Sequence, residues 1–145
     1  MLTTCNGKIR ILQLGHKRIP SREGGIEIVV EELSTRMANL GHEVICYNRK
    51  RHQPGVHEHK NKFYKGVRIK EIPTVDLKGL AAVSSSVSGA IGAAFGAYDV
   101  VHFHAEGTAV FCWLPKLFGK RVVVTVHGLD WQRAKWGTSS SRKKL

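Results

Sequence analysis

Histidines and acids follow three hydrophobic segments of this chain, at the points where the segments end. His16 follows the first segment, His104 and Glu106 follow a later one, and His127 and Asp130 follow the last. Imidazole and carboxylate groups can position hydroxyl groups and transfer protons. If the fold brings the ends of these segments together, the side chains will line one polar crevice.

A pair of glycines, Gly24 and Gly25, stands where a helical pattern begins. A helix N-terminus offers unpaired backbone N–H groups and the positive end of the helix dipole. Glycine at that place lets an anionic group approach the backbone with no Cβ in the way. A tight loop with positive φ would explain one glycine, whereas the pair favours contact with a phosphate.

Hydrophobic periodicity alternates between the spacing of a strand and that of a helix along the chain. Residues 26–40, for example, place apolar side chains three and four positions apart, and Gly41 follows them at the position that glycine favours after a helix. The predicted strands are 8–14, 43–47, 67–72, 99–104 and 121–127, and the predicted helices are 26–40, 78–97 and 106–118.

Strands that alternate with helices predict an α/β fold, a Rossmann-like open parallel sheet with helices on both faces. The apolar run Val122–Val126 is typical of a central strand that is covered on both faces. In a strand order of the 3-2-1-4-5 type, the ends of strands one, four and five are neighbours. Ligands bind beyond the carboxyl ends of such strands, so the polar crevice is expected there.

The histidines are not equivalent. His102 and His104 share one face of the fourth strand, and we expect His102, which lies deeper, to be a hydrogen-bonded core residue. His104 lies at the edge, where a ligand contact and a structural role are both open. His127 ends the fifth strand before a glycine and is expected to reach the crevice. Further histidines in the polar loop 49–64 lack the spacing that would aim them at a metal, so we expect a solvated loop there.

The totals favour one folded domain with an anionic partner. The 145 residues are 42% hydrophobic and 23% charged, with a formal net charge of +12. The basic residues are scattered, and we find no nucleic-acid-binding signature, so no specific nucleic-acid partner is expected. Three separated cysteines and an N-terminus without a signal-peptide core predict a protein of the reducing cytoplasm. The uncharged segment 79–98 is rich in serine and glycine, which favours a helix packed closely on the sheet over a membrane span.

Two nucleotide-binding motifs are absent. The G-x-G-x-x-G pattern of NAD-binding domains does not follow the first strand, and there is no P-loop. The second strand ends in Asn48 instead of an acid, and the basic residues 49–51 would suit the 2′-phosphate of NADP. An NADP-dependent reductase fragment therefore remains an alternative, as does a non-enzymatic basic module that binds a membrane surface or nucleic acid.

The order and spacing of several motifs resemble the N-terminal domain of bacterial family 4 glycosyltransferases. These motifs are "GGIE" and "ANLGHEVICY" around the first helix, then "YKGVRIKEIP", "DVVHFHAEG" and "KRVVVTVHGLDW". Such enzymes have a GT-B fold with two Rossmann-like domains. The resemblance implies a retaining transfer of sugar from a nucleotide-diphosphate donor to a lipid-linked or glycan acceptor, as in the synthesis of cell-surface polysaccharide or glycolipid, with no metal required and no other cofactor.

The resemblance also implies roles for individual residues. Gly24 and Gly25 would approach the donor diphosphate, and His127 would lie beside the donor sugar and position its hydroxyls or the developing charge. The acceptor side would be lined by His16, His104, Glu106, Gly107 and Asp130.

The sequence departs from the family in its extent. Residues 1–136 correspond to the N-terminal domain, and residues 137–145 form a polar, basic tail that we expect to be disordered. The domain that holds the nucleotide pocket does not follow, as in a truncation, a frameshift product or a half that works with a separate chain. We expect no appreciable transfer by these residues alone, and a peripheral location at the inner face of an anionic membrane.

Overall fold

Six strands form one sheet in the order β3-β4-β2-β1-β5-β6. A computed structural model describes residues 7–50, 61–75, 77 and 80–127. All neighbouring strands are parallel except β3 and β4. The strands are β1 (Arg10–Leu14), β2 (Glu43–Arg49), β3 (Asn61–Tyr64), β4 (Val67–Ile72), β5 (Val100–Phe103) and β6 (Arg121–Val124).

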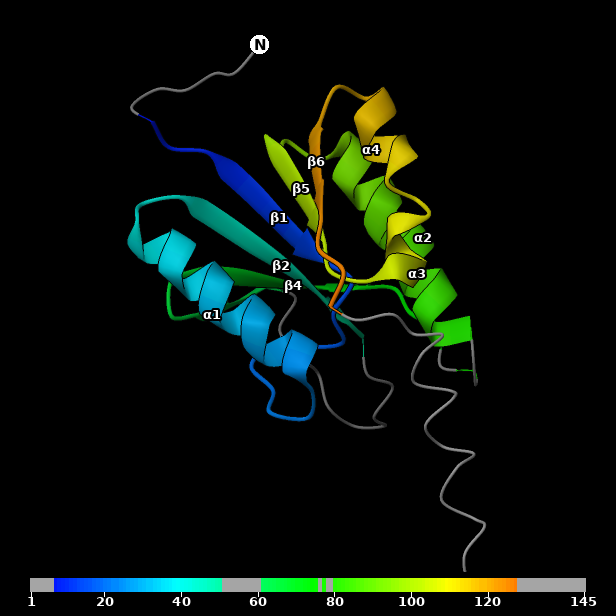
Figure 1. The fold of residues 1–145 in the computed structure, drawn as a ribbon, viewed down its shortest axis with the longest axis horizontal. Helices are drawn as coiled ribbons and strands as arrows, with labels where there is room; N and C mark the ends of the chain where they lie inside the picture. Colours follow the sequence, from blue (N-terminus) through cyan, green and yellow to red (C-terminus); the bar gives the residue numbers. More distant parts are fainter. Residues whose placement is uncertain (1–6, 51–60, 76, 78–79, 128–145) are drawn as a thin grey trace, which may run out of the picture.

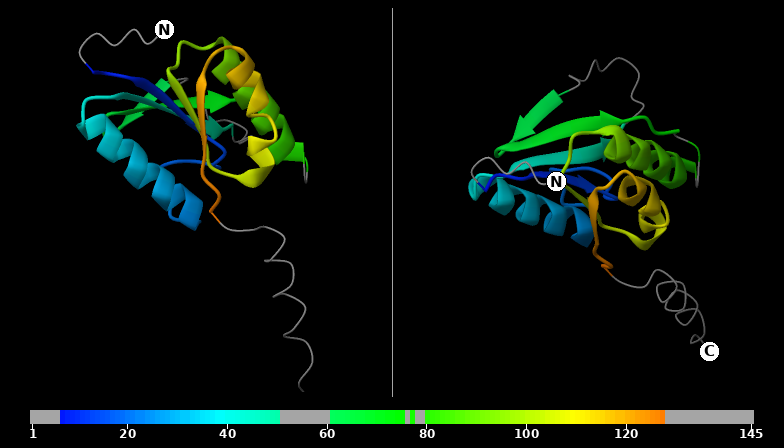
Figure 2. Two further views of the ribbon diagram at one scale, coloured as in Figure 1. Left: turned by 45° about the horizontal axis from the view of Figure 1, so that its top comes forward. Right: turned by 90° about the horizontal axis from the view of Figure 1, so that it is seen from above.

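Helices cover both faces of this sheet (Figure 1). The helices are α1 (Gly25–Asn39), α2 (Leu80–Phe95), α3 (Glu106–Ala109) and α4 (Trp113–Leu117). Helix α1 lies on one face, and α2, α3 and α4 lie on the other, as the turned views of Figure 2 also show. The predicted strand order is confirmed as β4-β2-β1-β5-β6, and the Rossmann-like α/β fold class is correct.

Helix α1 begins and ends where the sequence indicates. Gly24 is its extended N-cap residue, with no hydrogen bond from a capping side chain. After the helix, Gly41 has a φ of 94° and donates its N–H to the carbonyl oxygen of Ala38, 3.0 Å away. Val30 is fully buried in the cluster that joins α1 to β2 and β4.

Helix α2 confirms the expectation of a close contact through small residues. Its buried residues are Ser85, Ser86, Gly89, Ala90, Ala93 and Ala94. A Cβ added to Gly89 would lie 3.4 Å from side-chain atoms of both Leu14 and Ile72, so the helix backbone lies very near the sheet. The large residues of α2 face outward.

Strand β3 was missed in the predicted loop 49–64. It pairs antiparallel with β4 through a two-residue turn, in which Lys65 has a φ of 45° and Gly66 a φ of 81°. Positive φ at both central positions is the geometry of a type I′ hairpin. The sheet is therefore mixed rather than wholly parallel, with the added strand at one edge.

The predicted helix 106–118 is wrong as a single element, because it is divided into α3 and α4. Between the two, backbone hydrogen bonds join residues three apart: Phe111 N–H to the Thr108 oxygen at 3.2 Å, and Leu114 N–H to the Phe111 oxygen at 3.2 Å. Pro115 has no N–H to donate to Phe111, so a regular helical bond is lost at that point.

The prediction that Val122–Val126 is a central strand is also wrong. In the described part of the chain, β6 pairs only with β5 and forms the edge of the sheet. Val123 and Val124 are 45% and 41% exposed. An apolar run shows that a strand can be buried on both faces. Whether it is buried depends on the strands and helices that pack around it.

The remaining expectations concern the ends of the chain and the membrane. The boundary at residue 136 and the tail 137–145 lie outside the described residues. So do the histidines of the polar loop, His52, His57 and His59. Among the residues that the structure describes, no helix has both the length and the hydropathy that crossing a bilayer requires.

Candidate functional site

The loop after β1 meets the turn after β5 at the carboxyl edge of the sheet. Gly15 has a φ of 104°, and a Cβ added there would lie 2.9 Å from the backbone nitrogen of His104 and 2.8 Å from the hydroxyl oxygen of Thr108. His104 N–H donates to the carbonyl oxygen of Leu14 at 2.9 Å. Glycine is therefore required at position 15 by its conformation and by this close approach.

His104 and His127 form a hydrogen-bonded pair at this edge. The distance between His104 Nδ1 and His127 Nε2 is 3.1 Å, and the rings are stacked with centroids 5.4 Å apart. His104 Nε2 bonds to Gln13 Oε1, which can only accept, so His104 carries its proton on Nε2. His104 Nδ1 then accepts a hydrogen bond from His127 Nε2–H. The sheet thus fixes the orientation of His127 through His104 and Gln13.

His102 extends this row of rings by one step towards the start of β5. Its centroid lies 4.0 Å from that of His104, and its Nε2 lies 2.7 Å from the hydroxyl oxygen of Thr125. The Thr125 N–H in turn donates to the carbonyl oxygen of Phe103 at 2.8 Å. His102 is hydrogen-bonded as expected, although it is only half-buried.

His16 lies under the β1–α1 loop and holds that loop in place. Its Nε2 is 3.1 Å from Asn48 Oδ1, which also accepts the N–H of Ile19 at 3.1 Å. The Asn48 side-chain amide donates to the Ile19 carbonyl oxygen at 2.9 Å. His16 is 2% exposed, so the structure gives this residue a scaffolding position beneath the site.

Burial keeps two of these histidines neutral. Desolvation, together with smaller effects of the neighbouring His102, His16 and His127, lowers the pKa of His104 to about 3. Desolvation lowers the pKa of His16 to about 4, against the opposing effect of its bond to Asn48. At neutral pH both rings therefore act as hydrogen-bonding groups rather than as cations.

The glycine pair occupies the N-terminus of α1, and the two glycines differ. A Cβ added at Gly24 would meet the carboxylate of Glu27, whereas one added at Gly25 has no atom within 4 Å. Gly25 does not have a positive φ, so nothing in the described part of the chain requires glycine there. The buried Glu27 accepts the N–H of Lys17 at 3.2 Å, which places one carboxylate at this helix end.

The other predicted site residues lie around the same edge. Glu106 is half-buried in the first turn of α3, and Gly107 is exposed with open space around it. Asp130 lies outside the described residues. In the described ranges, no three histidine, cysteine or acidic side chains are grouped as a metal ion would need.

Several residues of the site were not predicted. Gln13, in the buried strand β1, orients His104 through a hydrogen bond. Asn48 fixes the β1–α1 loop by its bond to Ile19, and Thr125 bonds to His102. A polar residue between two leucines near the end of a strand, as in the "LQL" of "KIRILQL", is the signal that could have identified Gln13.

Comparisons with known proteins give a family from the sequence and a fold from the structure. The model of Glycosyltransferase Family 4 matches residues 23–145. A solved structure of sucrose-phosphate synthase from Thermosynechococcus elongatus superposes with a TM-score of 0.68 at 14% sequence identity. That match covers 94% of this chain and 37% of the synthase chain. No curated protein sequence matches the chain. Because the family model covers most of the sequence, this chain belongs to Glycosyltransferase Family 4, with the Rossmann-like fold of a GT-B enzyme's N-terminal half.

Proposed function

We propose that this chain is the acceptor-side half of a retaining glycosyltransferase. It would act on a nucleotide-diphosphate sugar and a lipid-linked or glycan acceptor in the synthesis of cell-surface polysaccharide or glycolipid. Family membership supports the reaction class. The observation that best supports a reacting centre is the His104–His127 pair beside the β1–α1 loop, in which His104 Nδ1 lies 3.1 Å from His127 Nε2.

In this proposal His127 positions the donor sugar. His104 is neutral and accepts a hydrogen bond from His127 Nε2–H, so His127 Nδ1, which has no hydrogen-bond partner among the described residues, can accept a hydrogen bond from a sugar hydroxyl. A group held in one tautomer and orientation costs little reorganisation when the sugar ring acquires positive charge. The acceptor would lie on the side of Glu106 and Gly107.

The N-terminus of α1 is proposed to face the leaving diphosphate. No capping side chain blocks the N–H groups at Gly24, and the space beside Gly25 is open. Charge on the diphosphate would be met by this helix end, without a metal ion. Glu27 also lies at the helix end, so a bound diphosphate would have to displace its carboxylate.

The experiment is a transfer assay on the 145 residues alone and on the same residues joined to the donor-binding half of a family 4 enzyme. We expect transfer only from the joined protein, because the chain spans 37% of the synthase that it matches. The anomeric configuration of the product, read by NMR, tests retention. Transfer by the 145 residues alone, or inversion by the joined protein, would contradict the proposal.

The free edge of the sheet at β6 is a candidate partner surface. The outer edge of β6 is unpaired in the described part of the chain, and its valines are partly exposed. We propose that a following segment or a separate chain that supplies the second domain covers this edge.

We further propose a cytoplasmic protein that touches the inner face of an anionic membrane through α2. The outward residues Leu80, Val83, Val87, Ile91 and Phe95 are all exposed, and α2 contains no charged residue. Lys116 lies on the neighbouring α4, and Arg49 and Lys50 line a pocket that includes Ala81 of α2. An apolar helix face bordered by cations fits an anionic lipid surface, whereas a second copy would bring like charges together.

Co-sedimentation with lipid vesicles tests this contact. The protein should bind phosphatidylglycerol-containing vesicles more than pure phosphatidylcholine vesicles, and Ile91→Ser should weaken that binding. Leu40→Ser is the matched control, because Leu40 is exposed at the end of α1. Equal binding to both lipids, or an equal loss in the control, would contradict the proposal.

A further inference from the structure

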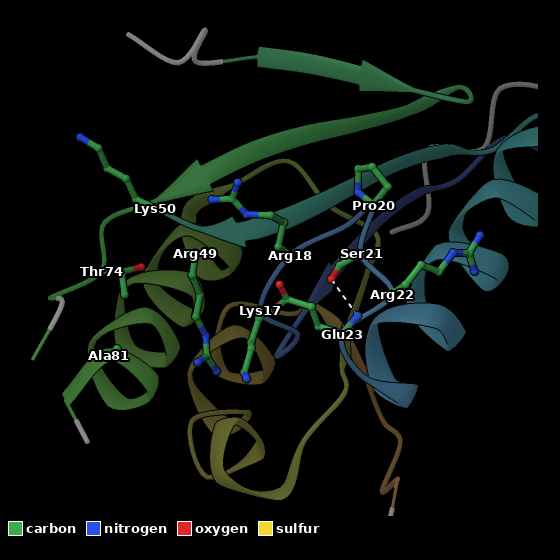
Figure 3. Close-up of a pocket in the computed structure, with 10 residues that line it drawn as sticks. All are labelled: Lys17, Arg18, Pro20, Ser21, Arg22, Glu23, Arg49, Lys50, Thr74 and Ala81. Atoms are coloured by element: carbon green, nitrogen blue, oxygen red, sulfur yellow. Dashed lines mark hydrogen bonds between the residues drawn. The ribbon is translucent and has the colours of Figure 1, made fainter. Parts of the chain in front are cut away.

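A cationic cavity of about 520 Å³ opens beside the β1–α1 loop (Figure 3). The loop 17–23, the end of β2, Thr74 and Ala81 contribute its lining. Five of the ten lining residues are basic, and one, Glu23, is acidic. The basic residues are Lys17, Arg18, Arg22, Arg49 and Lys50. This volume is within the range of small-molecule sites.

Backbone hydrogen bonds fix the main chain at Arg49 and Lys50, from which two of these cationic side chains extend. Arg49 N–H donates to the Lys17 carbonyl oxygen at 2.9 Å, and Lys50 N–H donates to the Ile72 carbonyl oxygen at 3.2 Å. Asn48 fixes the same loop through Ile19. Figure 3 shows the side chains of Lys17 and Arg49 extending in the same direction, while Arg22 points away from them.

Two of these cations have acidic neighbours among the described residues. Arg22 pairs with Glu31 at 3.7 Å, and Glu27 lies near Arg49. The buried part of Arg49 is desolvated, which lowers its pKa and disfavours its charged form unless an anion is near. Lys17 and Lys50 are exposed and add further charge at the mouth.

The position of the cavity within the sheet separates it from the reacting centre. Arg49 ends β2 and Lys50 follows it, whereas His127 follows β6, and the strand order β2-β1-β5-β6 puts three steps between the two strands. At about 4.8 Å per step, the two strands lie roughly 14 Å apart. The phosphate bonded to the transferred sugar must lie at the reacting centre, so an anion in this cavity belongs to a different group.

We propose that this cavity binds a phosphate group of the acceptor, remote from the hydroxyl that receives the sugar. The acceptor is therefore a phosphorylated sugar or a phosphate-linked lipid, and Arg49 and Lys17 are its principal contacts. Anion binding stands on the cavity itself, and its assignment to the acceptor rests on the proposed function. A guanidinium and an ammonium group together suit the geometry and charge of phosphate.

Titration calorimetry of the full chain in a phosphate-free buffer tests the proposal. The probes are inorganic phosphate, glucose 6-phosphate, glucose and NADPH, with phosphatidylglycerol vesicles as a competitor of inorganic phosphate. We expect saturable binding of phosphate-bearing probes and none of glucose. Binding of glucose 6-phosphate identifies a soluble source, and displacement of phosphate by vesicles alone identifies a lipid source.

Charge-matched variants separate a site from a basic surface. Arg49→Gln and Lys17→Gln should each weaken phosphate binding by about tenfold or more, because each removes a charge-assisted contact. Arg36→Gln and Lys116→Gln remove the same charge outside the cavity. These variants should change the affinity for phosphate by less than about twofold. Lys17 is exposed, so Lys17→Gln is expected to fold even if Arg49→Gln does not.

Three results would overturn the proposal. These are no saturable binding of any phosphate probe, equal losses in the cavity and control variants, and tighter binding of NADPH than of glucose 6-phosphate. None of these measurements requires sugar transfer. A failure here therefore leaves the transfer assay of the joined protein as a separate test of the proposed function.

Discussion

Helices α1 and α2 pack on opposite faces of one sheet by opposite means. Helix α1 buries charged and polar residues with Val30, and specific partners hold them: Glu31 accepts a hydrogen bond from Tyr64 at 2.8 Å. Helix α2 buries only small residues and turns its large apolar ones outward. The α1 face therefore depends on polar contacts, and the α2 face depends on close approach.

The difference accounts for where the candidate site lies. The polar contacts of the α1 face continue into the β1–α1 loop, where His16, Asn48 and Glu27 fix the backbone beside the site. The α2 face has its largest apolar side chains exposed, and one of them, Phe95, packs on Phe118. The α1 face thus leads to the candidate functional residues, and the α2 face has an exposed apolar surface.

The largest expected effect is overpacking of the α2 face. Ala93 is fully buried against the sheet, so Ala93→Leu should lower the free energy of unfolding by about 3 kcal/mol. Ile91→Leu, on the exposed side of the same helix, should change it by less than about 0.5 kcal/mol. Urea unfolding measures both, and tolerance of leucine at position 93 would show that α2 does not depend on close approach.

A smaller loss is expected on the α1 face. Glu31→Ala leaves the Tyr64 hydroxyl without its acceptor and should cost about 2 kcal/mol in the free energy of unfolding. Glu32, 54% exposed in its ion pair with Arg36, is the control, and Glu32→Ala should cost less than about 0.5 kcal/mol. Equal costs for the two variants would remove the distinction between the two faces.

Acid should weaken the loop that His16 holds. The folded-state pKa of His16 is about 4, below the ordinary value of 6.5, so the unfolded chain binds the proton more readily between these values. This contribution to stability is complete above about pH 6.5 and is lost as the pH falls towards 4, by up to about 1.4 kcal/mol per pH unit.

The control for this pH effect is His16→Asn. Removing the titrating ring should reduce the slope of stability against pH in the same window, as measured by urea unfolding at several pH values. An unchanged slope in the variant would mean that His16 is not buried in its neutral form.

The smallest expected effect has the opposite sign. Gly25→Ala should raise the free energy of unfolding by about 0.5 kcal/mol, because alanine favours a helix and no atom lies within 4 Å of its Cβ. In the protein joined to a donor-binding half, the same change should reduce transfer if a diphosphate approaches this backbone. Unchanged transfer would leave Gly25 without a role in donor binding.

Much of the fold could be predicted because local patterns and general topology rules agree. The alternation of strand and helix periods predicts the α/β sheet with helices on both faces, and the serine, glycine and alanine residues of α2 predict its close contact. The predictions that were wrong depend on how neighbouring strands and helices pack. The apolar run of β6 predicts coverage on both faces, but the strand lies at the edge of the sheet in the described part of the chain.

The site shows the same division. His104 and His127 could be placed at one edge, since parallel strands end together. Their hydrogen bond, and the part played by Gln13, depend on side-chain geometry between residues 91 positions apart. The two-residue turn at Lys65 and Gly66 was a local signal for β3 that the polar composition of the preceding loop obscured.

The most direct test of the reacting centre is sugar transfer by the joined protein with His127 replaced. His127→Ala should lower kcat by on the order of a hundredfold, as the loss of a positioned group at developing charge commonly does. His42, half-buried just before β2 at the opposite end of the strands, provides the control His42→Ala, which should leave kcat within about twofold. Undiminished transfer by His127→Ala would contradict the assignment of this centre.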